Sequence, residues 1–252
     1  MVAPADPKGI NKVGAPKSLN YSIESWGFVH GRYDNRRKVI GWGLFLGALV
    51  GVIAGAWVLT RMAGNNAHEV QKAQWYRAAQ MNESDMTAYI KQHNIKTVLR
   101  LVGTDGADTD DYETDVAATR RTGIRLVVAK LPTSRLPYRS ELSTLFEALD
   151  AIAANPNVRP VLVHCRQGSD RTGLVSLIWL HDYQGVEFAL AREQLKFFPY
   201  MHVAVGHKVD EFTDMYEKFS AGRPGVSIKH WVRDNYFEEK AGRDNRGWYL
   251  AK

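Results

Sequence analysis

The sequence holds a single cysteine, and an arginine follows it after a short interval. Residues 164–173 read HCRQGSDRTG, so five residues separate Cys165 from Arg171. A cysteine thiolate is a strong nucleophile, and a guanidinium presents parallel N–H donors that match the oxygens of a phosphate. The spacing therefore predicts that Cys165 attacks phosphorus to form a phosphocysteine while Arg171 holds two phosphate oxygens.

These residues lie where a strand is expected to end and a helix to begin. Residues 159–165 are mainly apolar and β-branched, which is typical of a buried strand, whereas Leu174 and Leu177 follow at helical spacing. Unpaired amides of the loop and of the first helical turn would face an anion there, and Gly168 lets the backbone curl tightly. The residues expected to bind phosphate are Arg166, Gln167, Gly168, Ser169 and Arg171.

Three neighbours of the nucleophile suggest further roles. The Thr172 hydroxyl is placed to hydrogen-bond the sulfur, which would help it leave when water hydrolyses the intermediate. Arg166 would look outward over the phosphate and favour polyanionic substrates. His164 either organises the loop from behind or is a hydrogen-bonded histidine of the core, and the sequence leaves both interpretations open.

The motif His-Cys-x5-Arg-Thr-Gly resembles the signature of the protein tyrosine and dual-specificity phosphatase superfamily, and it is most similar to the atypical dual-specificity branch. Residues 76–80, 95–101 and 123–128 are similar in order and spacing to the leading segment of that branch, so the resemblance covers about residues 74–220. Rhodanese-like sulfurtransferases carry a cysteine on such a loop, but theirs lacks the Arg-Thr-Gly ending. The resemblance implies the cysteine-phosphatase fold and hydrolysis that needs neither a metal ion nor a cofactor.

The general acid departs from the family pattern. In the family an aspartate on an upstream loop protonates the leaving oxygen, but residues 130–138 contain no carboxylate here. Asp170 is our candidate for this acid, because some bacterial relatives resemble this chain in having an aspartate just before the arginine. The alternative is that Asp170 orients Arg171 or caps the helix. Lys130 and Arg135 either flank the substrate or form a solvated surface pair.

Three functions are compatible with these residues. The first is a phosphatase acting on phosphotyrosine of a membrane-associated protein. The second is a phosphatase of inositol phosphates, inositol pyrophosphates, phosphoinositides or other phospholipids, which the missing upstream acid and the basic residues favour. The third is a pseudophosphatase that binds phosphorylated partners without turnover. The net charge of +6 lies largely beside an apolar segment and no nucleic-acid-binding module is recognised, so we exclude nucleic acid as the primary partner.

That apolar segment, residues 39–59, is a run of 21 residues without a charge, bounded by Lys38 and Arg61. At ~1.5 Å per residue a helix of this length reaches about 31 Å, close to the hydrocarbon thickness of a bilayer. A tryptophan near each end suits the membrane interface. We expect one transmembrane helix rather than a cleaved signal peptide, because the segment before the run is long and the run exceeds an ordinary signal-peptide core.

Four glycines, Gly43, Gly47, Gly51 and Gly55, recur along one face of this helix. Small residues at this spacing let two helices approach closely, which predicts a homodimer or another helix partner, although glycine is common in membrane helices generally. Lysines and arginines are denser before the run than after it. The positive-inside rule then predicts a cytoplasmic N-terminus and a catalytic domain on the opposite side. A single cysteine does not decide the side, so a catalytic domain that faces inward stays open.

The remaining pattern alternates between strands and helices, which predicts an α/β fold with a mainly parallel central sheet flanked by helices. Strands are expected at 97–102, 124–131 and 160–165, and helices at 110–122, 139–154, 173–184, 187–197 and 206–220. The acidic run 105–115 is expected to be a solvated loop and helix N-terminus. We divide the chain into a flexible basic tail (1–38), the membrane helix (39–59), a linker (60–73), the phosphatase domain (74–221) and a basic aromatic tail (222–252).

Overall fold

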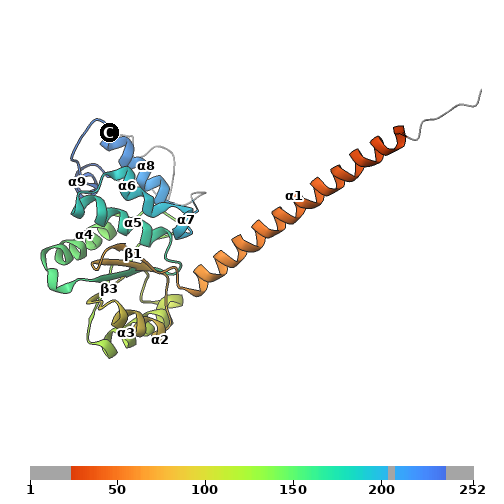
Figure 1. The fold of residues 1–252 in the computed structure, drawn as a ribbon. Coiled ribbons are helices and arrows are strands. Elements are labelled where there is room, and N and C mark those ends of the chain that lie inside the picture. The colour runs from red at the N-terminus through yellow and green to blue at the C-terminus, as the bar shows by residue number, and fades with distance from the viewer. Residues whose placement is uncertain (1–23, 204–207, 237–252) are drawn as a thin grey trace, which may run out of the picture. The chain divides into compact units, whose positions relative to one another are not determined.

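The computed structural model describes residues 24–203 and 208–236 (Figure 1). The chain divides into two compact units, Met1–Ala56 and Trp57–Lys252. Helix α1 (Glu24–Ala63) contains the segment Lys38–Trp57, which is long and apolar enough to cross a membrane. Residues 24–38 belong to this helix, so the last part of the predicted tail 1–38 is helical.

A five-stranded sheet organises the second unit in the order β1-β2-β5-β3-β4. Only β1 is antiparallel to its neighbour, which confirms the α/β class with a mainly parallel sheet. In the central strand, His164 is paired in register with Ala78 of β2 and Arg100 of β3. The strand bounds are β1 His68–Gln71, β2 Trp75–Ala78, β3 Thr97–Arg100, β4 Arg125–Val128 and β5 Val161–His164.

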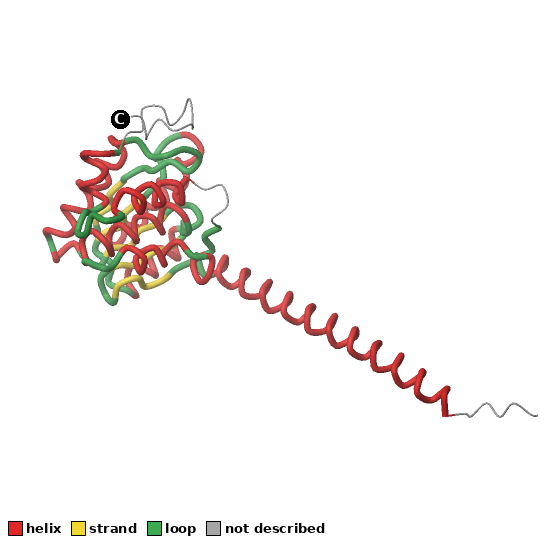
Figure 2. Tube along the Cα trace, turned by 90° about the horizontal axis from the view of Figure 1, so that it is seen from above, coloured by secondary structure: helices red, strands yellow, loops and turns green. Residues whose placement is uncertain are grey.

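Helices cover both faces of this sheet (Figures 1 and 2). Alternate strand residues divide between two cores: Tyr76, Val98 and Leu162 pack on one side, with the neighbouring residues on the other. Helices α2 (Glu83–Gln92) and α3 (Thr109–Thr122) cover the first face. The second is covered by α4 (Arg139–Ala154), α5 (Asp170–Ile178), α8 (Lys208–Ser220) and α9 (Ile228–Asn235).

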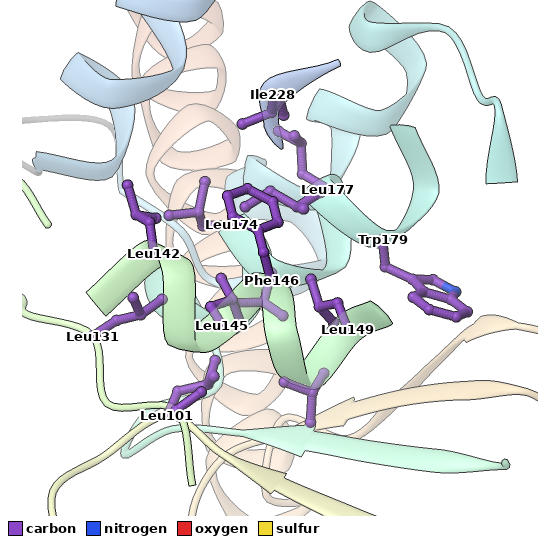
Figure 3. Packing of buried hydrophobic residues seen from close by; sticks show 14 of the residues in the cluster. Leu101, Leu131, Leu142, Leu145, Phe146, Leu149, Leu174, Leu177, Trp179 and Ile228 are labelled. Carbon is purple, nitrogen blue, oxygen red and sulfur yellow. The ribbon is translucent and has the colours of Figure 1, made fainter. Parts of the chain in front are cut away.

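The larger core lies on the side of α4 and α5 and supports the end of β5. In Figure 3, Leu145 and Phe146 of α4 lie between Leu101, just beyond β3, and Leu174 of α5. All four are buried, with at most 4% of their surface exposed. This packing holds the first turn of α5 in a fixed place above the sheet.

Short turns replace two of the predicted helices. Residues 173–184 are split, since α5 ends at Ile178 and a π-helical turn, Trp179–Tyr183, follows it. The predicted helix 187–197 is three pieces, and the last two are separated by Lys196, which has an extended backbone. The remaining turns are η1 Gly106–Asp108, η2 Pro156–Val158, α6 Phe188–Ala191, η4 Arg192–Leu195 and α7 Phe197–Tyr200.

Two elements that pack in the second unit lie outside the predicted bounds of the phosphatase domain, 74–221. The linker 60–73 contains β1, which pairs with β2 and therefore belongs to the sheet. The tail 222–252 contains α9, whose Ile228, Trp231 and Val232 recur on one face and are buried. The domain thus extends at least to Tyr236, whose hydroxyl donates to the Pro137 carbonyl at 2.7 Å. The last sixteen residues, 237–252, lie outside the described part of the chain.

Candidate active site

The cysteine and the arginine meet at the carboxyl end of the central strand. Cys165 directly follows β5 and is buried, with 3% of its surface exposed. Arg171 lies in the first turn of α5, so residues 165–169 join the strand to the helix. A cavity of about 520 Å³ opens over this loop, and we call it the active-site pocket. Its lining residues are Ala107, Asp108, Thr133, Cys165, Arg166, Gln167, Ser169, Asp170 and Arg171.

The carbonyl groups of the loop are bonded from outside the pocket. The Arg166 carbonyl accepts from the backbone N–H of Gln80 at 3.1 Å, and the Gln167 carbonyl accepts from Asn66 Nδ2 at 3.1 Å. The next two carbonyls accept from one guanidinium nitrogen, Arg77 Nη2, at 2.7 and 3.0 Å. Because the C=O and N–H of a trans peptide point in opposite directions, this arrangement turns the loop amides toward the pocket.

One of these amides, that of Gly168, points directly at the sulfur of Cys165. The Gly168 N–H donates to Cys165 Sγ at 3.3 Å. A backbone N–H that points at the sulfur also points at an anion bound beside it, so the loop is built to hold a phosphate.

Arg77 is the residue that fixes the loop from behind. Its side chain is fully buried and also donates to the Gln194 carbonyl at 2.8 Å, while the Tyr200 ring lies 4.1 Å from its guanidinium carbon. Burial lowers the pKa of Arg77 to about 10, so the guanidinium stays charged near neutral pH. Arg77 is not among the site residues predicted from the sequence.

Gly168 is required at its position by both space and backbone conformation. Its φ is +70°, and a Cβ there would lie 2.5 Å from the Ala79 nitrogen and 2.6 Å from the Ala78 carbonyl carbon. Gly168→Ala is therefore expected to lower stability by more than ~2 kcal/mol and to remove most activity. Gly123→Ala is the matched control, because Gly123 has a φ of +69° with no atom within 4 Å of its Cβ position. Thermal unfolding and turnover of 4-nitrophenyl phosphate measure both variants, and equal behaviour would contradict the steric argument.

Arg171 is anchored by the ends of two strands. Its Nη1 donates to the carbonyls of Leu101 and Leu131, each at 3.4 Å. These two carbonyls follow β3 and β4, while Arg171 itself lines the pocket. Thr172 is fully buried, and among the described residues its hydroxyl has no hydrogen-bond partner. The predicted bond from this hydroxyl to the Cys165 sulfur stays a prediction.

His164 lies behind the loop in a buried ionic network. Its Nε2 is 3.2 Å from Asp115 Oδ2, a close contact that does not meet the geometry of a hydrogen bond. Asp115 also accepts from Arg100 Nη1 at 2.5 Å and from Gln80 Nε2 at 2.8 Å. Burial opposes ionisation of Asp115, but contacts with His164, Gln80 and Arg100 outweigh it and lower the pKa of its carboxyl. Asp115 belongs to the acidic run that we expected to be solvated, so that expectation is wrong for this residue.

Asp170, the predicted acid, lines the pocket and is held by a histidine distant in sequence. Its Oδ1 lies 2.8 Å from His202 Nδ1. On its other side, His202 Nε2 lies 3.1 Å from both carboxylate oxygens of Asp210. Neither His202 nor Asp210 could be predicted as a site residue, because no sequence motif connects them to the loop.

The basic residues at the rim are each paired with a carboxylate. Arg166 donates to Asp108 Oδ1, with the Nε contact at 3.0 Å. Lys130 lies 3.6 Å from Asp105, and Arg135 forms two hydrogen bonds to Glu141 at 2.8 and 2.6 Å. Neither Lys130 nor Arg135 lines the active-site pocket, whereas Thr133 of the same segment does.

Comparison with known proteins gives a family and several similar folds. A family model described as "Tyrosine phosphatase family" matches residues 59–187. No curated protein matches the sequence. Solved structures with a similar fold include TpbA of P. aeruginosa, at 20% identity with a TM-score of 0.48 over 61% of this chain and 86% of that one.

Two further solved structures are similar to this chain. The core catalytic domain of the PP-IP phosphatase SIW14 from S. cerevisiae has 20% identity and a TM-score of 0.47, over 63% of this chain and 92% of that one. The PTP-2 phosphatase of Cydia pomonella has 12% identity and a TM-score of 0.45, over 58% of this chain and 87% of that one.

Proposed function

The chain belongs to the tyrosine phosphatase family, and from this premise we propose that it hydrolyses phosphate monoesters through a phosphocysteine on Cys165, with phosphotyrosine as its preferred substrate. The main support for this proposal is the orientation of the loop 165–169. Its carbonyl groups point away from the pocket and accept hydrogen bonds from Gln80, Asn66 and Arg77. Amides turned inward around a buried thiol form a cradle for the three free oxygens of a phosphate.

In the first step the Cys165 thiolate attacks phosphorus, and the bond between phosphorus and the leaving oxygen breaks. The S–P bond forms with the sulfur lone pair, and the leaving oxygen departs with the electron pair of the broken bond and takes a proton. Arg171 holds two equatorial oxygens in its planar fork, where charge builds up in the transition state. In the second step water attacks phosphorus, the sulfur leaves as thiolate, and Thr172 donates a hydrogen bond to it.

The pairing of the rim cations supports a substrate with one phosphate. Arg166 at the pocket wall and Lys130 and Arg135 nearby each have a carboxylate partner, so a polyphosphate would gain little net attraction from them. Inositol phosphates or phosphorylated lipids are the second candidate, since Arg166 still lines the pocket. A binding module without turnover is the third.

Turnover by the full chain in detergent micelles tests this proposal. The substrates are 4-nitrophenyl phosphate, a phosphotyrosine peptide, a phosphoinositide and an inositol pyrophosphate. We expect the first two to be hydrolysed most efficiently, because their single phosphate fits the cradle and their aryl oxygen leaves readily. Preference for the inositol compounds would establish the second candidate, and binding of the peptide without turnover of any substrate would establish the third.

Asp108→Asn tests whether the ion pair between Asp108 and Arg166 slows the hydrolysis of polyanionic substrates. The substitution keeps the size of the side chain but removes the charge that neutralises Arg166. We expect kcat/KM for a phosphoinositide to rise about two- to fivefold, as suits a partly exposed ion pair, while 4-nitrophenyl phosphate changes less. Asp105→Asn is the control, because Asp105 pairs with Lys130 and does not line the pocket. An equal rise on both substrates would contradict the argument.

We also propose that the segment 39–59 anchors the protein in a membrane as a single pass. The described helix over Lys38–Trp57 supports this by its length and composition. The distribution of lysine and arginine favours a cytoplasmic N-terminus with the catalytic domain on the opposite side. Association through Gly43, Gly47, Gly51 and Gly55 stays a prediction from their spacing.

A further inference from the structure

His202 has no part in the mechanism given above, yet it contacts Asp170, the first residue of α5, which lines the active-site pocket. We propose that His202 and Asp170 together hold the single proton that the leaving oxygen needs, and that Asp210 keeps this proton on the pair. The inference rests on the proposed function, since it concerns how the same site supplies its general acid. His202 acts through Asp170 and is therefore a positioning and proton-holding residue.

The geometry places the three side chains in a chain that leads away from the pocket. Asp170 lines the active-site pocket from the first turn of α5. His202 lies behind it, 2% exposed, with Nδ1 at 2.8 Å from Asp170 and Nε2 at 3.1 Å from Asp210 of α8. An imidazole between two carboxylates donates from both ring nitrogens only when it is protonated.

The electrostatic surroundings agree with a protonated ring. Burial opposes the charge on His202, but the hydrogen bonds to Asp170 and Asp210 and the negative charges of both outweigh it and raise its pKa. Among the described residues, these two aspartates are the charged groups that face the ring, from α5 and α8. Arg77 of β2 also interacts electrostatically with Asp170.

The proton balance closes over one catalytic cycle. In the resting pair His202 is protonated and Asp170 is a carboxylate, so the pair holds one transferable proton. When the bond to the leaving oxygen breaks, a proton passes from His202 Nδ1 to Asp170 and from Asp170 to that oxygen, which leaves His202 neutral and Asp170 a carboxylate. When water attacks the phosphocysteine, the water proton returns to Asp170 and then to His202. No further donor is needed, which accounts for an upstream segment 130–138 that has no carboxylate.

His202→Gln tests this inference in the full chain. Glutamine can still donate a hydrogen bond toward Asp170 but carries no transferable proton. We expect kcat to fall by roughly 100-fold on phenyl phosphate, whose oxygen leaves poorly, and by less than about fivefold on 4-nitrophenyl phosphate. In wild type, kcat on phenyl phosphate should decline at high pH as His202 loses its proton, and this decline should be absent in the variant.

Asp210→Asn gives a second and milder test. Removing that carboxylate takes away one cause of the raised pKa, so His202 loses its proton at a lower pH. We expect the high-pH decline on phenyl phosphate to move down by roughly one pH unit, with near-normal kcat below it. His230→Gln is the control, because His230 is an exposed histidine of α9 that pairs with Asp234.

The outcomes separate this inference from the function on which it rests. Wild type that turns over neither substrate would overturn the proposed function and the inference together. If wild type is active but His202→Gln loses equal activity on both substrates, or if Asp210→Asn leaves the pH profile in place, the inference alone is overturned.

Discussion

Replacing Cys165 with serine is expected to lower kcat by about 10⁴-fold or more on every substrate while phosphate binding is kept. A serine hydroxyl ionises far less readily than a thiol and is a weak nucleophile without an adjacent base. The side chain keeps nearly the same shape, and the Gly168 N–H that donates to Sγ can donate to an oxygen instead. The loop carbonyls remain tied to Gln80, Asn66 and Arg77, so the cradle itself should survive.

Two measurements on wild type and Cys165→Ser check this expectation. Turnover of 4-nitrophenyl phosphate reports the nucleophile, and calorimetric titration with a phosphotyrosine peptide reports the cradle. Cys165 is the only cysteine of the chain, so inactivation of wild type by iodoacetate gives an unambiguous chemical control. Residual turnover within about tenfold of wild type would contradict the assigned nucleophile.

The local part of the site follows from the sequence, because a strand, a short loop and a helix are continuous in the chain. The apolar run before Cys165 and the helical spacing after Thr172 predict where the loop starts and ends. The parallel sheet follows from the alternation of strands and helices. Each of these features is determined by neighbouring residues, which a sequence pattern can report.

The parts that were missed depend on contacts between distant segments. Arg77 and Arg100 each lie in a fully buried strand of four residues. In so short a strand one charged residue makes the apolar pattern hard to recognise, and it does not by itself indicate a functional site. Asp115 looks solvated within its acidic run, yet the turn of α3 directs it to Arg100 and His164. A charged residue inside an otherwise apolar strand was the available signal, since such a charge requires a buried partner.

The sequence shows that residues 130–138 contain no carboxylate, but it does not show which other carboxylate could protonate the leaving oxygen. The pocket wall at this segment is formed by Thr133, whereas the described carboxylates that line the pocket are Asp108 and Asp170. Asp108 is bound to Arg166, and this bond lowers the pKa of its carboxyl, so it is a poor proton donor. Asp170 with His202 is the arrangement that can carry a proton to the leaving oxygen.

Arg171→Lys is expected to lower kcat/KM by roughly 10³-fold although the positive charge is retained. Arg171 reaches the carbonyls of Leu101 and Leu131 with Nη1 while the same guanidinium faces the pocket. A planar fork serves both purposes because its N–H groups point in several fixed directions. A lysine ammonium would have to give up either the strand ends or the two parallel bonds to phosphate.

Arg166→Lys is the matched control for this loss, since Arg166 lies in the same loop and lines the same pocket but is bound to Asp108 at the rim. It should change kcat/KM on 4-nitrophenyl phosphate by less than about threefold, because its contact is a partly exposed ion pair. Both variants are compared by steady-state kinetics and by thermal unfolding. If the two lysine variants lose activity equally, the loss does not depend on the two-pronged binding of phosphate by Arg171, and this prediction is wrong.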